Sequence, residues 1–179
     1  MLAKRITLLV TILFLTGGMS FAQKLAYVDS EYIMKHIPEY NTAQKNLDDL
    51  SQQWQKEVDK QYEDVERLYQ AYQQDQPQLN QDMRRRREDE IVNKEKAAKE
   101  FQRTKFGFDG ELFKQREALM KPIQTKVDKA LQDLATAQQL DFIFDKKSEN
   151  SFLYSNPKLD KSNEVIIKLG LKPNPAFAN

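Results

Sequence analysis

The chain has 179 residues, of which 31% are charged and 40% hydrophobic, with a formal net charge of +1 at pH 7 and no cysteine. This balance suits amphipathic helices better than a thick globular core, and a near-neutral chain has no bulk attraction for nucleic acid. Without cysteine, disulfide bonds and thiolate metal centres are excluded.

The N-terminus has the pattern of a secretory signal peptide. Lys4 and Arg5 precede an apolar run at residues 6–15, and a small-x-small triplet stands directly before Gln23. The apolar run is about half of the ~20 residues that a membrane-spanning helix needs, and no cysteine follows it for lipid attachment. We therefore expect export, with removal of residues 1–22. The remaining chain has 26 basic and 27 acidic residues and a formal charge of −1.

A short β-strand is predicted at residues 25–29, where β-branched and aromatic residues gather. Asp29 or Ser30 can cap a short helix that follows this strand. The helix should end near Pro38, because the residue before a proline disfavours helical backbone angles. Pro38 can then begin the next helix as its first residue.

A long antiparallel coiled-coil hairpin is predicted over residues 41–121. Between Pro38 and Phe106 there is no glycine, and Pro77 is the only proline. Apolar residues in the first arm recur about every 3.57 positions, which lies between the coiled-coil and straight-helix periods. They are Leu47, Leu50, Trp54, Val58, Tyr62, Val65, Tyr69 and Tyr72.

The tip of the hairpin is expected near residues 75–81, where proline interrupts the helical ladder. Two equal arms of about 50 Å would pair on either side of this turn. The resulting register places Gly107, Gly110 and Pro122 at the base of the hairpin. A kink is expected at Pro122, because a proline inside a helix removes a backbone hydrogen bond.

Short strands are predicted again after the hairpin, at residues 141–145 and 151–155, joined by a polar loop. Asp160 or Ser162 can cap a final amphipathic helix. Gly170 is a natural stop for that helix.

Residues 23–40 and 122–172 are expected to form a small β-rich association body, and residues 173–179 a loose tail. A core of this size usually needs disulfides, metal or oligomerisation. Disulfides are excluded and no metal-ligand pattern is evident, so we expect the strands to pair between copies of the chain. The apolar residues expected in the association body are Leu25, Tyr27, Val28, Phe142, Ile143, Phe144, Leu153, Tyr154, Val165, Ile166 and Leu169.

The order and spacing of several segments resemble the Skp/OmpH family of periplasmic chaperones. The segments are residues 25–30, the long charged hairpin, residues 121–124, residues 141–145 and residues 153–160. The resemblance implies a homotrimer in which three helical arms hang from a shared β-rich body around a central cavity. It also implies an energy-independent holdase for unfolded outer-membrane proteins in the periplasm.

The chain departs from the family pattern in two ways. Residues 138–140, Gln-Gln-Leu, stand where the family often has a glycine-containing turn, so we expect a differently shaped junction. Family members are often basic, whereas this chain is near neutral, which weakens a purely electrostatic account of client capture.

The sequence gives little support for an enzyme, a cofactor site or a metal site. His36 is the only histidine, and its place beside Pro38 fits the end of a helix better than a general base. No nucleophile-elbow or phosphate-loop pattern occurs, so ATP use is not expected. We therefore expect no enzymatic activity, no cofactor and no metal.

The basic run Arg84, Arg85, Arg86 and Arg87 is the most conspicuous local signal. It could attract lipid headgroups, lipopolysaccharide or acidic client segments at the tip of the hairpin. Alternatively, the facing arm neutralises it, because residues 47–76 have a formal charge of −5 and residues 81–121 one of +3. Exposed ion pairs between the arms are then expected. Nucleic-acid binding is not expected, given the export signal and the neutral charge.

Aromatic residues in the arms are the other candidate contacts for a client. Those on the periodic stripe could instead form the seam between the arms, and Phe106 is the better surface candidate because it lies off the 101/108 register. The aromatic candidates are Tyr62, Tyr69, Tyr72, Phe101, Phe106 and Phe108.

Together these patterns predict an α+β protein, with a long helical hairpin on a small association body. The hypothesis is an ATP-independent periplasmic holdase whose arms enclose an unfolded client. The alternatives are a structural coiled-coil spacer in the cell envelope and an adaptor that clasps one folded partner.

Overall fold

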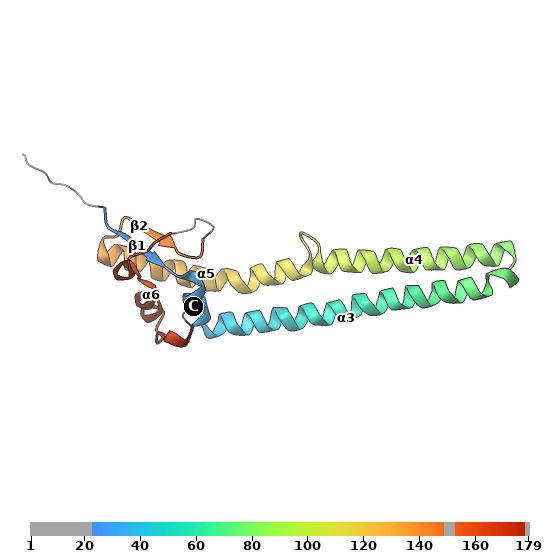
Figure 1. Ribbon diagram of the computed structural model, residues 1–179, viewed down its shortest axis with the longest axis horizontal. Coiled ribbons are helices and arrows are strands. Elements are labelled where there is room, and N and C mark those ends of the chain that lie inside the picture. The colour runs from blue at the N-terminus through green and yellow to red at the C-terminus, as the bar shows by residue number, and fades with distance from the viewer. Residues whose placement is uncertain (1–22, 149–152, 178–179) are drawn as a thin grey trace, which may run out of the picture.

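The computed structural model describes residues 23–148 and 153–177, in which two long helical arms extend from a small body (Figure 1). The signal peptide predicted at residues 1–22 lies outside the described residues. The elements in chain order are β1 Leu25–Val28, α2 Ser30–Lys35, α3 Pro38–Asp75, η1 Gln76–Gln78, α4 Gln81–Phe106, α5 Glu111–Gln138, β2 Phe142–Asp145, η2 Pro157–Leu159, α6 Ser162–Lys168 and η3 Pro175–Phe177.

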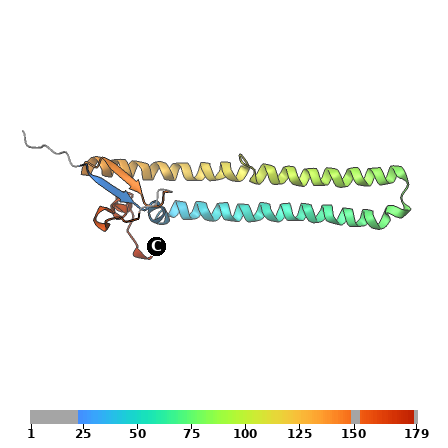
Figure 2. The same ribbon diagram turned by 45° about the horizontal axis from the view of Figure 1, so that its top comes forward.

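The first arm is α3, whose 38 residues span about 57 Å. The chain returns along α4 and then α5, and Figure 2 shows the two arms running side by side. The expected turn is confirmed, because α3 ends at Asp75 and the 3₁₀ turn η1 contains Pro77. Asn80 begins α4, and its side chain accepts a hydrogen bond from the backbone N–H of Met83 at 2.9 Å.

The seam between the arms follows most of the predicted stripe. Leu47, Val58 and Tyr72 on α3 are buried, and Ala98 on α4 is fully buried. Tyr69 departs from the prediction, since its side chain is 46% exposed. A period slightly above 3.5 makes the apolar stripe drift around the helix. Near the tip, a position extrapolated from the coiled-coil register therefore no longer faces the other arm.

The position of the break in the returning arm corrects the predicted register. Phe106 packs edge-on against Trp54, with ring centroids 6.3 Å apart. Trp54 is roughly 24 Å along α3 from its first residue, Pro38, so the neighbouring Gly107 lies well away from the base. The base is instead marked by the ion pair between Lys126 and Glu39 at 2.8 Å. The returning arm is unbroken at the base, because α5 continues from the arm into the body as one helix.

Pro122 does lie near the base, where it lines a groove with Pro38, Ala43 and Ile123. The helix α5 continues through it from Glu111 to Gln138. The missing N–H of a proline removes one helical hydrogen bond, yet packing on the facing arm keeps the helix continuous.

The sheet corrects the predicted pairing of strands. β1 pairs with β2 in parallel, with Leu25 opposite Phe142 and Val28 opposite Asp145. The prediction was that residues 141–145 form a pair of strands with residues 151–155. Pairing of strands between copies of the chain stays a prediction. Of the second predicted strand, residues 151–152 lie outside the described residues and residues 153–155 are not in a strand. The physical reason is that α5 returns the chain beside β1, which places β2 within reach of its ladder.

The predicted helix ends are largely confirmed. Asp29 caps α2, accepting a hydrogen bond from the N–H of Tyr32 at 2.9 Å, and Pro38 is the first residue of α3. Asp160 accepts hydrogen bonds from the N–H and hydroxyl of Ser162 at the start of α6. Gly170 ends that helix with φ of +77°.

The C-terminal residues differ from the loose tail that was expected. Residues 175–177 form η3, and the ring of Phe177 lies 4.9 Å from that of His36, centroid to centroid. The backbone N–H of Asn174 also donates a hydrogen bond to His36. Aromatic packing and one backbone bond therefore hold this segment against the body.

One hydrophobic core joins the body to the base of the arms. Its members come from β1, α2, α3, α5 and α6, so the helices of the arm and the body share one buried cluster. They are Val28, Tyr32, Ile33, Ile37, Ala43, Leu47, Met120, Ile123, Val127, Ala130, Leu134, Val165 and Ile166. Beyond this cluster the arms bury only a narrow seam.

Gln139 accounts for the unusual junction after α5. It has φ of +55°, a left-handed conformation, while Leu140 N–H donates to the carbonyl of Ala135 at 2.9 Å. This is the hydrogen bonding of a glycine-terminated helix, made here without glycine.

Replacing Gln139 by glycine should therefore stabilise the protein by about 1 kcal/mol, because glycine adopts left-handed angles without the penalty of a Cβ atom. The substitution loses only an exposed 3.3 Å hydrogen bond from Lys24. The matched control is Gln132→Gly, at an exposed position inside α5, which should destabilise by about 0.5–1 kcal/mol. Urea unfolding measures both, and a change of the same sign in the two variants would contradict the assignment.

Candidate functional site

The residues expected in the association body separate into a buried and an exposed set. Tyr27, Val28, Val165 and Ile166 are buried in the core of the single chain. Ile143 and Leu169 pack against that core. The exposed set is Leu25 at 41%, Phe142 at 53%, Phe144 at 43%, Leu153 at 101% and Tyr154 at 80%. Only this second set is available for contact with another molecule.

Leu25, Phe142 and Phe144 form one apolar surface, called here the sheet patch. The parallel register places Leu25 beside Phe142, and the rings of Phe142 and Phe144 stack with centroids 6.2 Å apart. Side chains alternate along a strand, so Ile143 points to the core while its two neighbours point outward. Parallel sheets are usually covered on both faces, which makes this exposed apolar face unusual for a finished fold.

A groove runs behind the sheet patch between β2, α2 and α5. Its apolar lining includes Met34, Val127, Leu131 and Ile143, and Phe144 stands at its margin. The groove is continuous with the exposed sheet residues, so the body presents a ridge of aromatic rings beside an apolar hollow.

Tyr72 belongs to the seam rather than to the outer surface of the arm. Its hydroxyl donates to the carboxylate of Glu88 and accepts from the amide of Gln76 at 3.1 Å. The hydrogen bond to Glu88, together with burial, raises the pKa of Tyr72 above its ordinary value. The tyrosine is therefore neutral at physiological pH and fastens the two arms near the tip. Tyr69, by contrast, is exposed.

An aromatic and cationic cluster closes the arm at the break between α4 and α5. The ammonium of Lys105 lies 4.7 Å from the ring centroid of Trp54 and 5.5 Å from that of Phe101. The same ammonium forms an ion pair with Glu111, which begins α5 beyond the break. One side chain thus links both arms and both halves of the returning arm.

The aromatic residues around this break reverse part of the prediction. Phe106, expected on the surface, is half-buried against Trp54, whereas Phe108, expected on the stripe, is 93% exposed. The stripe was extrapolated along an unbroken helix, but α4 ends at Phe106. A Cβ atom on Gly107 would lie 2.4 Å from the carbonyl oxygen of Arg103, so the chain leaves the helix in a tight turn that admits only glycine.

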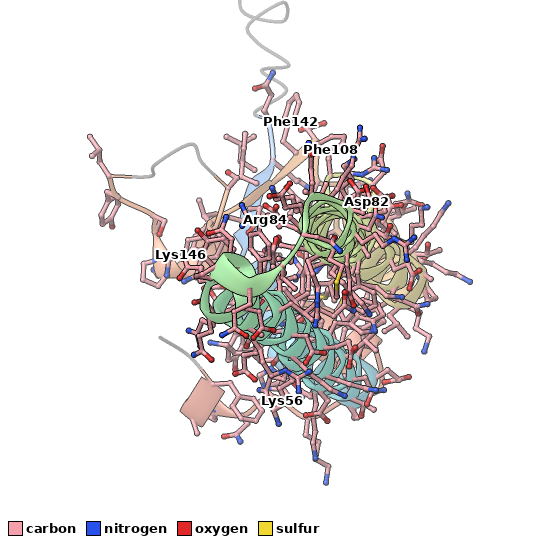
Figure 3. All side chains as sticks on the ribbon, turned by 90° about the vertical axis from the view of Figure 1, so that its right-hand side faces the viewer. Lys56, Asp82, Arg84, Phe108, Phe142 and Lys146 are labelled. Carbon is pink, nitrogen blue, oxygen red and sulfur yellow. The ribbon has the colours of Figure 1, made fainter. Side chains whose placement is uncertain are left out.

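The loop that carries Phe108 projects from the arm on the same side as the sheet. Figure 1 shows the loop and the two strands above the long axis of the molecule, and Figure 3, seen from the tip, places Phe108 and Phe142 toward the same side. The most exposed aromatic residue of the arms and the sheet patch therefore face one direction.

The four arginines lie at the start of the returning arm. The guanidinium of Arg84 donates to the carbonyl of Leu79 at 3.0 Å and so fastens the tip turn. Arg87 lies 3.9 Å from Glu90 in the same helix. Arg85 and Arg86 are exposed at the end of the molecule, where an anionic group has access to them.

The recorded ion pairs differ from those predicted between the oppositely charged arms. In the described residues, the pairs of the arms are mostly within one helix, such as Asp64–Arg67 and Glu95–Lys99. Lys126–Glu39 is the ion pair recorded between α3 and the returning arm. Side chains three or four apart on one helix are nearest neighbours, whereas the seam between the arms is apolar, so charges pair locally.

The described residues offer neither a metal site nor a membrane-spanning helix. Among residues 23–148 and 153–177, no group of three or more acidic or histidine side chains is placed to hold a metal ion. None of the helices in this described part has the length and hydropathy needed to cross a bilayer. His36 is a buried residue at the end of α2, and both of its ring nitrogens are hydrogen-bonded.

The cluster around Trp54 and Lys105 and the docking of the C-terminal residues were not predicted. For the first, the spacing of Gly107 and Gly110 was a usable signal of a helix break, but it was assigned to the base. For the second, the sequence carries no signal, because Asn174 and Phe177 reach His36 only through the path of the chain.

Comparison with known proteins identifies a family and a similar solved structure. Residues 24–169 match the model of a family described as outer membrane protein (OmpH-like). A solved structure, that of a candidate outer membrane chaperone (OmpH-like) from Caulobacter crescentus CB15, has a similar fold with a TM-score of 0.65 and 14% sequence identity. The similarity covers 83% of this chain and 84% of that one. Among curated proteins, none matches the chain in sequence.

The substitution Lys105→Gln should destabilise the arm by about 1 kcal/mol, because it removes a cation from between aromatic rings and a partly buried ion pair. It should also change the fluorescence of Trp54, which is the only tryptophan. The control is Lys99→Gln, which breaks an exposed pair within α4 and should leave the thermal midpoint nearly unchanged. Equal losses of stability in the two variants would show that the cluster does not hold the break together.

Proposed function

Because the chain belongs to the outer membrane protein (OmpH-like) family, we propose that it is a periplasmic holdase chaperone for unfolded outer-membrane proteins. The observation that carries the proposal is Phe108, a 93% exposed aromatic ring on the flank of a long arm, which faces the same side as the sheet patch. The likeness of fold to the candidate outer membrane chaperone (OmpH-like) from Caulobacter crescentus supports it.

The proposed oligomer is a homotrimer assembled through the sheet patch. Leu25 and Phe142 expose large apolar side chains on a face that a parallel sheet normally covers. Leu153 and Tyr154 add exposed apolar surface in the segment that follows. A second copy of the chain is the simplest cover for such a face, and the trimeric number comes from the family resemblance. Three arms mounted on one body would then surround a central space.

In this arrangement the interior of the trimer would receive the side of the arm that carries Phe108. Copies that meet through the sheet patch turn that side of each molecule toward a common axis. The loop at residues 107–110 projects on the same side, so its aromatic ring would face the enclosed client. Tyr69 is a second exposed aromatic residue of the arms, whereas Tyr72, Phe101 and Phe106 serve the seam and the break.

The proposed mechanism is binding of the unfolded state by mass action, with no covalent step and no ATP. A protein that binds only the unfolded client lowers the free concentration of that client and thereby opposes its aggregation. Scattered single contacts on long arms are individually weak and add up over many positions, so many different clients can be held and released.

We further propose that Arg85 and Arg86 contact anionic groups at the tip. The two guanidinium groups are exposed at the end farthest from the body, beyond the local pairs of Arg84 and Arg87. Acidic client segments, lipid headgroups and lipopolysaccharide all offer the phosphate or carboxylate that arginine binds in bidentate fashion.

The periplasmic location belongs to the same proposal. It rests on the signal-peptide pattern before Gln23 and on the description of the family as outer membrane protein (OmpH-like). The structural spacer remains the competing function, and the adaptor for one folded partner is another. Both differ from a holdase in having no preference for unfolded chains.

The protein should suppress the aggregation of a urea-denatured outer-membrane β-barrel protein on dilution, at near-stoichiometric amounts. Phe108→Ser should weaken client affinity by roughly 3- to 10-fold, since one partly buried aromatic contact contributes about 1 kcal/mol. The control is Ile167→Ser, an exposed apolar residue of α6 away from the arms, which should have no effect. Absence of suppression by the unaltered protein would favour the spacer.

Phe142→Glu should dissociate the oligomer, because a carboxylate in an apolar interface is costly to desolvate. Sedimentation equilibrium at micromolar concentration measures the mass, and the unaltered protein should have three times the mass of one chain. The matched control, Ile167→Glu, introduces the same charge on exposed surface of the body and should leave the mass unchanged. A monomeric unaltered protein would refute the trimer, and with it the enclosed space.

A further inference from the structure

His36 occupies the joint between the body and the first arm. It follows α2 as the capping residue and stands two positions before Pro38, where α3 begins. Its side chain is buried, with 8% of the residue exposed. Its ring is packed between two others, that of Tyr32 at 4.5 Å and that of Phe177 at 4.9 Å, measured between centroids.

Both ring nitrogens of His36 have backbone partners, and these partners define the tautomer. Nε2 lies 2.7 Å from the backbone nitrogen of Asn174, which is an N–H donor, so Nε2 accepts. Nδ1 lies 2.7 Å from the carbonyl oxygen of Tyr32, so Nδ1 carries the proton and donates. A neutral imidazole satisfies both bonds at once, and a doubly protonated ring cannot.

The residues that reach His36 form a strap across the joint. The strap, residues 171–177, leaves the end of α6 at Gly170 and crosses to the start of the first arm. Within it the side chain of Asn174 accepts from the N–H of Ala176 at 3.0 Å, which shapes η3. The strap therefore meets His36 in a preformed turn, through one backbone hydrogen bond and one aromatic contact.

We propose that His36 is a pH-sensitive latch: its protonation releases the C-terminal strap from the joint between the body and the arm. A proton on Nε2 would point an N–H group at the N–H of Asn174, which replaces attraction by repulsion between two donors. The neutral ring binds the strap, so the strap is docked while the imidazole is neutral and is released when the ring takes up a second proton.

The contacts recorded for the ring are with Tyr32, Asn174 and Phe177. From α2 the ring faces Tyr32. Burial and the charge of Asp160 raise the pKa of Tyr32, so its phenol stays neutral at neutral and acidic pH. From the strap the ring faces an asparagine backbone and a phenylalanine ring, neither of which titrates. The neighbouring charges on the two helices are paired elsewhere, Glu31 with Lys35 and Glu39 with Lys126, each at 2.8 Å.

Release of the strap has a consequence for the arm. While docked, it ties α6 of the body to the point where α3 begins, in addition to the shared core. Without it, the joint keeps the core contacts of Ile33 and Ile37 but loses its outer cover. We therefore expect the first arm to move more freely on the body at acidic pH.

Hydrogen exchange measured by mass spectrometry on the purified protein tests the latch. After correction for the intrinsic pH dependence of exchange, the amides of the strap should exchange at least roughly tenfold faster at pH 5.5 than at pH 8. Peptides from the buried helix α6 should not change between the two values. In parallel, NMR of the single histidine should titrate with the same midpoint as the exchange step.

Three variants separate the latch from general loosening. His36→Phe keeps an aromatic ring but has no acceptor, so its strap should exchange fast at both pH values. Phe177→Ala should speed exchange throughout and retain the pH step. The matched control, Lys172→Gln, alters an exposed strap residue and should behave like the unaltered protein.

Two results would overturn the proposal. One is a pH step that persists in His36→Phe, since another group would then control the strap. The other, independent of whether that variant folds, is an unaltered protein whose histidine titrates with no change in strap exchange at the same pH.

Discussion

The parallel pairing of β1 with β2 is the constraint on which the rest of the structure depends. Parallel strands cannot be joined by a tight turn and need a long crossover, and in this chain the whole helical hairpin is that crossover. The register from Leu25–Phe142 to Val28–Asp145 places the end of α5 beside the start of β1, and the end of β2 beside the start of α2. The core cluster then joins these helices, so that both arms leave the body from one fixed point.

Away from that point, the arms are held together by a narrow apolar seam and by two local side-chain interactions. Tyr72 and Glu88 close the tip, and Lys105 with Trp54 closes the break in the returning arm. Most of the recorded ion pairs of the arms lie within single helices, so they add little to the association of the arms. An arm built in this way can keep its length and shape while most of its surface stays open to a client.

The body has one side that is buried by its own chain and one side that exposes apolar residues. The inner side, with Val165 and Ile166, is buried completely, and the strap over His36 covers the joint. The outer side of the sheet leaves Phe142 exposed, on the side toward which Phe108 also projects. This asymmetry connects the proposals for assembly and client binding, because one direction of the molecule serves both.

Local sequence signals were enough to predict several elements of the fold. The caps at Asp29 and Pro38, the turn at Pro77 and the end of α6 at Gly170 follow from backbone chemistry that neighbouring residues decide. The seam positions Leu47 and Val58 follow from helical period. The other features follow from the way the chain folds in space: the partner of β2, the place of the Gly107 break along the arm, the exposure of Phe108 and the docking of Phe177 on His36. Those features depend on which distant segments meet, and a one-dimensional pattern carries no record of distance between segments that the path of the chain brings together.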